Sequence, residues 1–131
     1  MIAADTDILA ARRASQELGR AVGFSLTELT FIATAISEVA RNILSYAGWG
    51  EIRLALEERS GRAGLVVEAT DHGPGIANVG AALQNGYQRS SGGGIGLPGA
   101  KKLMDEFEIR SIPGQGTTVT MRKWVAAHAA Q

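Results

Sequence analysis

The sequence predicts an α/β two-layer sandwich, in which helices cover one face of a mixed, mostly antiparallel sheet. Segments with the 3.6-residue period of a helix alternate with segments that carry the two-residue period of a strand. Two pairs of strand-like segments are joined by short turns that contain glycine, which favours antiparallel pairing. The chain has 131 residues, of which 45% are apolar, so residues 1–131 are expected to form a single domain around one core.

The first half of the chain is expected to contain a short strand and two helices. Residues 7–11 resemble a strand, and residues 12–22 have helical spacing that ends before Gly23. Ser25 and Glu28 have the spacing of a capping box, in which each side chain bonds the other residue's backbone N–H. A long helix is predicted from there to about Tyr46, because its apolar residues recur with the helical period.

The second half is expected to contain two hairpins separated by a glycine-rich region. In chain order the predicted elements are a strand over 51–58, a turn over 60–64, a strand over 65–71, a short helix over 78–83, a loop over 85–96, a helix from Leu97, and strands over 107–112 and 117–124 joined by a turn at 113–116. A loop of that length within a compact domain is usually functional.

Composition excludes several classes of function. The formal net charge is zero, so there is no electrostatic reason to expect nucleic acid or a membrane surface as a partner. The chain has no cysteine, which excludes disulfides and thiolate metal sites. No apolar stretch approaches the roughly 20 residues of a membrane span, and the N-terminus lacks the features of a signal peptide. A cytoplasmic location is therefore expected.

Glu38 and Asn42 are the first candidate site residues. They are four positions apart on the predicted long helix, so both side chains project from one face. An amide oxygen is a suitable Mg²⁺ ligand, and a carboxylate beside it could accept a proton from an attacking hydroxyl. Taken alone, however, the pair is better explained as a solvent-exposed helical face.

Asp71, Gly73 and Gly75 form the second candidate. Asp71 ends a predicted strand, and its ionised carboxylate could accept a hydrogen bond from an exocyclic amino group such as that of adenine. The two glycines let the chain turn without side chains that would block a pocket. An ordinary Asp-Gly-Pro-Gly turn explains the same residues equally well.

The third candidate is a glycine run that leads into a helix. It comprises Gly92, Gly93, Gly94 and Gly96, followed by Leu97. Backbone N–H groups and the positive end of a helix dipole favour phosphate, and Lys101 could add charge. No Gly-Lys-Ser/Thr follows, so the run is not a P-loop, and no parallel strand–turn–helix unit surrounds it as in a Rossmann fold. A flexible linker is the alternative, against which the apolar Ile95 and Leu97 argue.

In this order the three candidates resemble the nucleotide-binding boxes of the GHKL ATPase and kinase superfamily, the Bergerat fold. The segment from Gly114 to Thr117 resembles the last box of that superfamily. The resemblance implies that Asp71 binds the adenine of ATP near Thr117, that Asn42 ligates Mg²⁺, and that Gly73 and Gly75 line the pocket floor. It also implies that the residues from Gly92 to Leu97 hold the phosphates and that Glu38 is the catalytic base.

Within this superfamily the chain is most similar to RsbT-type switch serine/threonine kinases. The Leu-Pro-Gly run from Leu97 and the Met-Asp-Glu-Phe run from Met104 carry this likeness. It implies a STAS-domain antagonist as substrate, and a PPM-type phosphatase regulator or a sigma-factor regulator as a further partner, with a possible dimer. The alternative is an anti-sigma factor or another nucleotide-regulated binding module without significant kinase activity.

Overall fold

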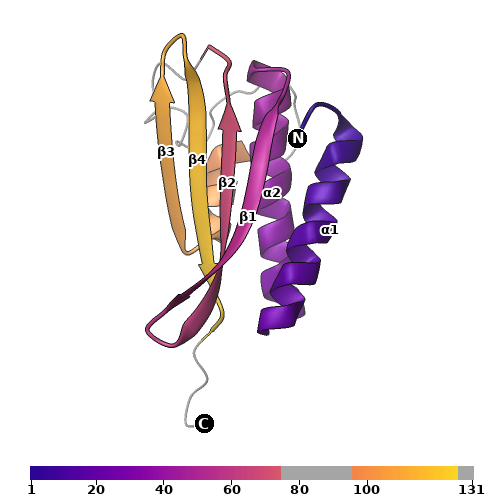
Figure 1. The fold of residues 1–131 in the computed structure, drawn as a ribbon, viewed down its shortest axis with the longest axis vertical. Coiled ribbons are helices and arrows are strands. Elements are labelled where there is room, and N and C mark those ends of the chain that lie inside the picture. The colour runs from indigo at the N-terminus through magenta and orange to yellow at the C-terminus, as the bar shows by residue number, and fades with distance from the viewer. Residues whose placement is uncertain (75–95, 127–131) are drawn as a thin grey trace.

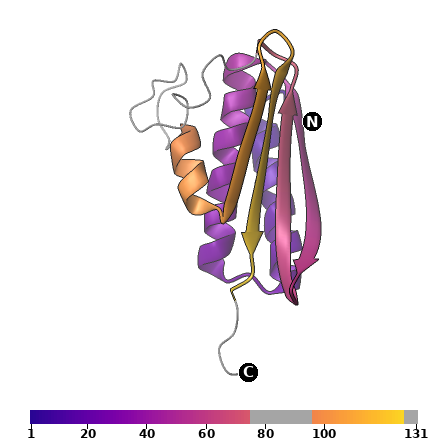
Figure 2. The same ribbon diagram turned by 90° about the vertical axis from the view of Figure 1, so that its left-hand side faces the viewer.

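In the computed structural model, a four-stranded antiparallel sheet is covered on one face by helices (Figures 1 and 2). The structure describes residues 1–74 and 96–126. The elements in chain order are α1 (Asp5–Val22), α2 (Leu26–Tyr46), β1 (Gly50–Arg59), β2 (Arg62–Asp71), α4 (Gly96–Leu103), β3 (Glu106–Ile112) and β4 (Gly116–Trp124). The predicted short helix at 78–83, the loop from 85 to 95 and the end of the chain after Ala126 lie outside the described residues.

The strands lie in the order β1-β2-β4-β3, and every pairing among the described residues is antiparallel. The predicted two-layer sandwich with helices on one face is therefore confirmed. The central pair, β2 and β4, joins the β1–β2 hairpin to the β3–β4 hairpin, with Asp71 opposite Thr117 and Gly64 opposite Trp124. This register places alternate residues of each strand on the face under the helices.

One hydrophobic core fills the space between the helices and the sheet. Its helical side is mainly α2, whose buried apolar residues repeat with the helical period, and α4 packs beside α2 (Figure 2). The most deeply buried large residues of this core are Ile2, Ile32, Ile36, Val39, Leu65, Val67, Leu97 and Met121. No helix of the described ranges is both long and apolar enough to cross a membrane.

The predicted strand at residues 7–11 is wrong, because this segment belongs to α1. The Asp7 carboxylate caps the helix by accepting hydrogen bonds from the backbone N–H groups of Ala3 (2.9 Å) and Ala4 (3.0 Å). Two aspartates in the first turn also suit the positive end of the helix dipole. Among the described residues near the N-terminus, the only β-type pairing is an antiparallel bridge between Ile2 and Gly50.

The start of α2 is as predicted. Ser25 Oγ accepts a hydrogen bond from the Glu28 backbone N–H (3.1 Å), and Glu28 Oε1 accepts one from the Ser25 N–H (2.8 Å). This capping box satisfies two N–H groups that have no partner within the helix. The helix then continues to Tyr46, as the spacing of its apolar residues predicts.

The β1–β2 hairpin is longer than predicted. Its turn consists of Ser60 and Gly61 alone, so the return strand begins at Arg62 and not at residue 65. Both turn residues have positive φ, 55° and 77°, which is the conformation of a type I′ turn. That turn matches the twist of the two strands, which allows the ladder to continue from Arg59 into Arg62.

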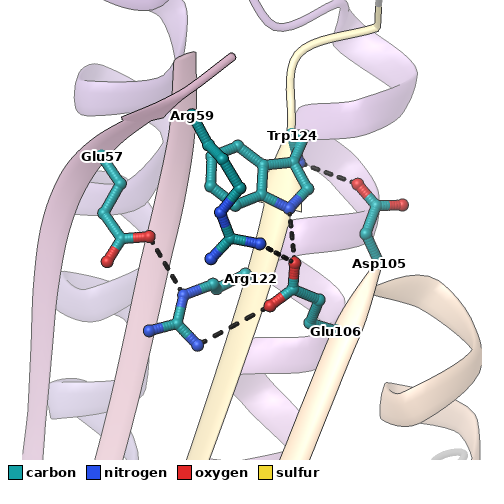
Figure 3. A network of polar contacts seen from close by, with 6 residues as sticks. All are labelled: Glu57, Arg59, Asp105, Glu106, Arg122 and Trp124. Carbon is teal, nitrogen blue, oxygen red and sulfur yellow. Dashed lines mark hydrogen bonds and ion pairs between the residues drawn. The ribbon is translucent and has the colours of Figure 1, made fainter. Parts of the chain in front are cut away.

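The open face of the sheet carries a polar network around Trp124 (Figure 3). The indole Nε1 donates a hydrogen bond to Glu106 Oε2 (2.9 Å), which also accepts one from Arg59 Nη1 (2.8 Å). The Arg59 guanidinium lies 4.5 Å from the centroid of the Trp124 ring. Asp105 Oδ2 accepts a hydrogen bond from the Trp124 backbone N–H (2.8 Å). The acidic pair of the Met-Asp-Glu-Phe run therefore ties the start of β3 to the end of β4.

Replacement of Gly64 by alanine is expected to destabilise the fold. A Cβ atom at this position would lie 2.4 Å from Cε3 of the Trp124 ring, which the network above holds in place. We expect a loss of about 1–3 kcal/mol in the free energy of unfolding, as is usual for overpacking. Urea denaturation of Gly64→Ala measures it. The control is Gly61→Ala at the turn, where a Cβ would meet no atom within 4 Å and only the strain of a positive φ is added. Equal stability of Gly64→Ala and the wild type would contradict the packing.

The Glu106 network is expected to make stability depend on acid pH. The indole hydrogen bond, then the charges of Arg59 and Arg122, hold the pKa of the Glu106 carboxyl below its ordinary value of 4.5, while burial opposes them. A lowered folded-state pKa stabilises the fold above pH 4.5, and this contribution is lost as the pH falls through the folded-state pKa. Thermal melts from pH 7 to pH 2 should therefore show wild type and Glu106→Gln converging below pH 4.5. A gap of constant size would contradict this.

Candidate functional site

One row of residues crosses all four strands at the end of the sheet where β2 ends. Gly50 pairs with Asp71, Asp71 with Thr117, and Thr117 with Ser111. A Cβ at Gly50 would point at Ile43 of α2, so this row lies on the face under the helices. Asp71 is 6% exposed and Thr117 is 5% exposed. The structure therefore brings together two predicted adenine-site residues that are far apart in sequence.

The Asp71 carboxylate contacts the backbone just beyond the end of β2. Its Oδ1 accepts a hydrogen bond from the Gly73 backbone N–H (2.9 Å), while its Oδ2 accepts none from the described residues. An ionised carboxylate is only an acceptor, so Oδ2 can receive a hydrogen bond from a ligand amino group. The neighbouring residue Thr117 has a hydroxyl group 2.9 Å from Ser111 Oγ.

Two glycines allow backbone segments to approach closely around Asp71. A Cβ at Gly73 would lie 2.9 Å from the Tyr46 carbonyl oxygen and 2.7 Å from the Ala47 Cβ, at the end of α2. Gly116 has φ of 132°, and a Cβ there would meet the carbonyl oxygen of Asp71. Any larger residue would separate α2 or the β3–β4 turn from the end of β2. Gly73 therefore allows the close approach of α2 to the end of β2, and its role in the floor of a nucleotide pocket remains a prediction.

Glu38 and Asn42 are both buried on α2, with 2% and 5% exposure. The alternative that they lie on a solvent-exposed helical face is therefore wrong. Both belong to the half of α2 that ends beside Gly73. A charged residue as deeply buried as Glu38 needs polar partners, because burial of an unpaired charge is costly.

Two donors hold the Glu38 carboxylate. Oε1 accepts a hydrogen bond from the backbone N–H of Gly96 (2.9 Å), which is 58 residues away at the start of α4. Oε2 accepts one from Arg41 Nη1 (3.0 Å), one turn along α2. Gly96 has φ of 70°, which a residue with a side chain rarely adopts. The glycine that begins α4 therefore links the third predicted motif directly to the first.

The start of α4 is anchored in the core. Leu97 and Ala100 are buried, with 2% and 0% exposure, and Pro98 lies in the first turn, as predicted. Lys101 is exposed and lies in the last turn, where its charge suits the negative end of the helix dipole. The Leu103 carbonyl at that end accepts a hydrogen bond from Lys123 Nζ (2.8 Å). The role of Lys101 near phosphate remains a prediction.

Figures 1 and 2 show that α2 and β2 end, and β4 begins, at one end of the molecule, whereas α4 begins partway along α2, where Gly96 contacts Glu38. Five predicted site residues outside α2 lie at the end of β2, just beyond it, or at the starts of α4 and β4, namely Asp71, Gly73, Gly96, Leu97 and Thr117. Gly75, Gly92, Gly93 and Gly94 lie outside the described residues. Asp71 lies at this end of the molecule, and the buried Glu38 carboxylate lies with the start of α4 further along α2.

Binding of Mg²⁺ at this site would depend on the phosphates of a bound nucleotide as well as on protein side chains. Among residues 1–74 and 96–126, no three His, Cys, Asp or Glu side chains are grouped to hold a metal ion. Mg²⁺ is usually bound through one or two protein oxygens together with substrate phosphates and water. A buried amide such as that of Asn42 fits such a site as a single protein ligand.

Two residues at this site were not predicted from the sequence. Arg41 contacts Glu38, and its position three residues further along the same helix was a usable signal. Ser111 faces Thr117, and the turn predicted at 113–116 places these two residues near each other.

Comparison with known proteins agrees with this geometry. The family model for the histidine kinase-like ATPase domain matches residues 2–123. The serine/threonine-protein kinase RsbT of Bacillus subtilis (strain 168) is 42% identical over 124 residues, which cover 95% of this chain and 93% of RsbT. The anti-sigma F factor of Pasteuria penetrans is 35% identical over 112 residues, which cover 79% of this chain and 73% of that protein.

Among solved structures, the histidine kinase domain of the E. coli osmosensor EnvZ, determined by NMR, is similar with a TM-score of 0.48 and 21% sequence identity. The match covers 92% of this chain and 89% of that one. The family model matches nearly the whole sequence, and RsbT is similar over almost its full length. The chain therefore belongs to the histidine kinase-like ATPase domain family.

Proposed function

We propose that this protein is a serine/threonine protein kinase that transfers the γ-phosphoryl group of ATP to a STAS-domain antagonist protein in a partner-switching module. The near full-length likeness to RsbT, which is named a serine/threonine-protein kinase, supports the reaction class. The observation that carries the proposal is the buried Glu38 carboxylate, held by the Gly96 N–H at the start of α4. This carboxylate is an acceptor beside the proposed phosphate-binding segment, where phosphoryl transfer to a hydroxyl group uses a general base.

The proposed nucleotide site uses the row at the end of β2. Asp71 Oδ2 accepts a hydrogen bond from the adenine amino group, with the Thr117 hydroxyl beside it on β4. Gly73 and Gly75 line the floor of the pocket. Gly92, Gly93, Gly94 and Gly96, with Leu97, hold the phosphates, and Lys101 adds positive charge. The backbone N–H groups at the start of α4 and its helix dipole favour an anion there.

Asn42 is the proposed Mg²⁺ ligand. Bound there, the ion would neutralise negative charge on the β- and γ-phosphates as the phosphoryl group is transferred. The side chain suits this role because it is buried on α2 one turn beyond Glu38, on the same face of the helix.

Glu38 is the proposed general base. The proton of the substrate hydroxyl passes to the Glu38 carboxylate as the bond between the substrate oxygen and the γ-phosphorus forms. The bond from that phosphorus to the β–γ bridging oxygen breaks, and ADP leaves with its electron pair.

A second candidate function is an anti-sigma factor or another nucleotide-regulated binding module without significant kinase activity. The likeness to the anti-sigma F factor of Pasteuria penetrans favours it. Incubation of the chain with a STAS-domain protein and labelled Mg-ATP separates the two. The kinase proposal expects phosphoserine or phosphothreonine on the STAS protein. Its absence at saturating Mg-ATP would leave the binding module as the function.

The proposed partner-switching module would operate in the cytoplasm. Its further partner would be a PPM-type phosphatase or a sigma-factor regulator, and this chain could form a dimer.

Replacement of Glu38 by glutamine is expected to remove transfer while nucleotide still binds. The amide has nearly the shape of the carboxylate but cannot act as a base, so the transfer rate should fall by about 10²–10⁴-fold. Single-turnover transfer from labelled ATP measures the rate, and calorimetry measures ATP affinity. Glu68→Gln is the matched control, because Glu68 lies on the open face of the sheet and pairs with Arg53. Transfer by Glu38→Gln at the wild-type rate would exclude Glu38 as the base.

Replacement of Asp71 by asparagine is expected to weaken ATP binding by roughly 10- to 100-fold, the usual effect of losing a hydrogen bond to a charged acceptor. The asparagine amide group can present a donor towards the adenine amino group, which is itself a donor. Calorimetric titration with ATP and with inorganic triphosphate checks the assignment. Triphosphate should bind both proteins equally. Unchanged ATP affinity would contradict the assignment of Asp71 to adenine.

A further inference from the structure

Arg41, one turn along α2, forms an ion pair with Glu38, the proposed base. Its Nη1 lies 3.0 Å from Glu38 Oε2, and its own side chain is 44% exposed, whereas Glu38 is 2% exposed. The guanidinium also forms part of the wall of a groove of about 350 Å³ between α1 and α2. Arg41 therefore reaches from solvent to a buried carboxylate.

The second nearby arginine has a different partner. Arg12 of α1 lines the same groove, but its Nη1 donates a hydrogen bond to Ser37 Oγ (2.9 Å). Ser37 Oγ in turn donates to the Ala33 carbonyl (3.1 Å). Of these two arginines, the one that contacts Glu38 is Arg41.

The two contacts on Glu38 restrain different oxygens from different elements. The Gly96 N–H holds Oε1 from the start of α4, and Arg41 holds Oε2 from α2 itself. The terminal torsion of a glutamate is broad, so each contact on a carboxylate oxygen narrows the range of orientations that the group adopts. Two contacts on opposite oxygens define the plane of the carboxylate, and with it the direction in which it accepts a proton.

We infer that Arg41 is a positioning residue, which orients the Glu38 carboxylate for proton transfer through the Nη1–Oε2 contact. The inference rests on the proposed role of Glu38 as the base. Arg41 acts through Glu38, so its loss should lower kcat and leave the KM for ATP unchanged. The contact uses a single N–H donor, so a lysine, which is a point charge with rotatable donors, should replace it in part.

Two measurements on the full chain test the inference. The first is hydrogen exchange of the Gly96 amide by NMR without nucleotide, relative to the amide of Val67 in the core, because this N–H reports the orientation of Glu38 without any reaction. The second is transfer of phosphate from labelled Mg-ATP to the STAS-domain protein.

Both measurements are made on four variants, namely Arg41→Ala, Arg41→Lys, Glu38→Gln and the double variant Glu38→Gln/Arg41→Ala. Arg53→Ala is the matched control, since Arg53 is 80% exposed and pairs with Glu68 at 3.7 Å on the open face.

In Arg41→Ala we expect Gly96 exchange to rise by roughly fivefold, because the loosened carboxylate opens more often. We expect kcat to fall by about tenfold with the KM for ATP unchanged. Arg41→Lys should recover part of both effects, and Arg53→Ala should match the wild type. The double variant should lose no more activity than Glu38→Gln, since two residues that act as a unit are not additive.

Three results would overturn the inference. These are wild-type Gly96 exchange in Arg41→Ala, a wild-type kcat in Arg41→Ala, and a further loss of activity when Arg41→Ala is added to Glu38→Gln. An inactive wild type would instead overturn the proposed kinase function, and the Gly96 exchange rate would still decide whether Arg41 orients Glu38. The two failures are therefore distinguishable.

Discussion

The antiparallel pairing of β2 with β4 is the constraint on which the rest of the structure depends. It joins Arg62–Asp71 to Gly116–Trp124, two segments far apart in sequence, and its register places Asp71 opposite Thr117 under the helices. A slip of one residue would move Asp71 to the open face, because neighbouring strand residues point to opposite sides. The network around Trp124 and Glu106 holds the other end of the same ladder. The proposed adenine site is therefore a consequence of sheet register.

The second constraint is the burial of polar groups on α2. Glu38 and Asn42 are placed where a helix of this amphipathic pattern would normally carry apolar residues. The Glu38 charge is compensated by Arg41 and by the backbone N–H of Gly96, which is the first residue of α4. The same contact that makes the buried charge tolerable also connects the proposed base to the start of the proposed phosphate-binding segment.

Local patterns predicted those parts of the fold that local interactions determine. The capping box of Ser25 and Glu28 marked the start of α2, and alternating residues marked the strands. The first turn of α1 was misread as a strand because residues 8–11 are apolar in a run, and the capping role of Asp7 was overlooked. The sequence predicts a β1–β2 turn over 60–64 because Gly64 resembles a turn residue. In the structure Gly64 lies in β2, beneath the Trp124 ring. The Glu38–Gly96 contact, 58 residues apart, depends on tertiary packing and has no local pattern. The roles of Gly75 and of Gly92 to Gly94 remain predictions.

The central claim is that the end of the sheet that holds Asp71 and Thr117 binds the adenine nucleotide. It is tested most directly by titrating the isotope-labelled chain with the ATP analogue AMP-PNP and Mg²⁺ and following backbone amide shifts by NMR. The account predicts the largest shifts at Asn42, Asp71, Gly73, Gly96 and Thr117, with little change at Arg53 and Arg122 on the open face. Shifts that are largest on the open face, or absent at saturating nucleotide, would contradict it.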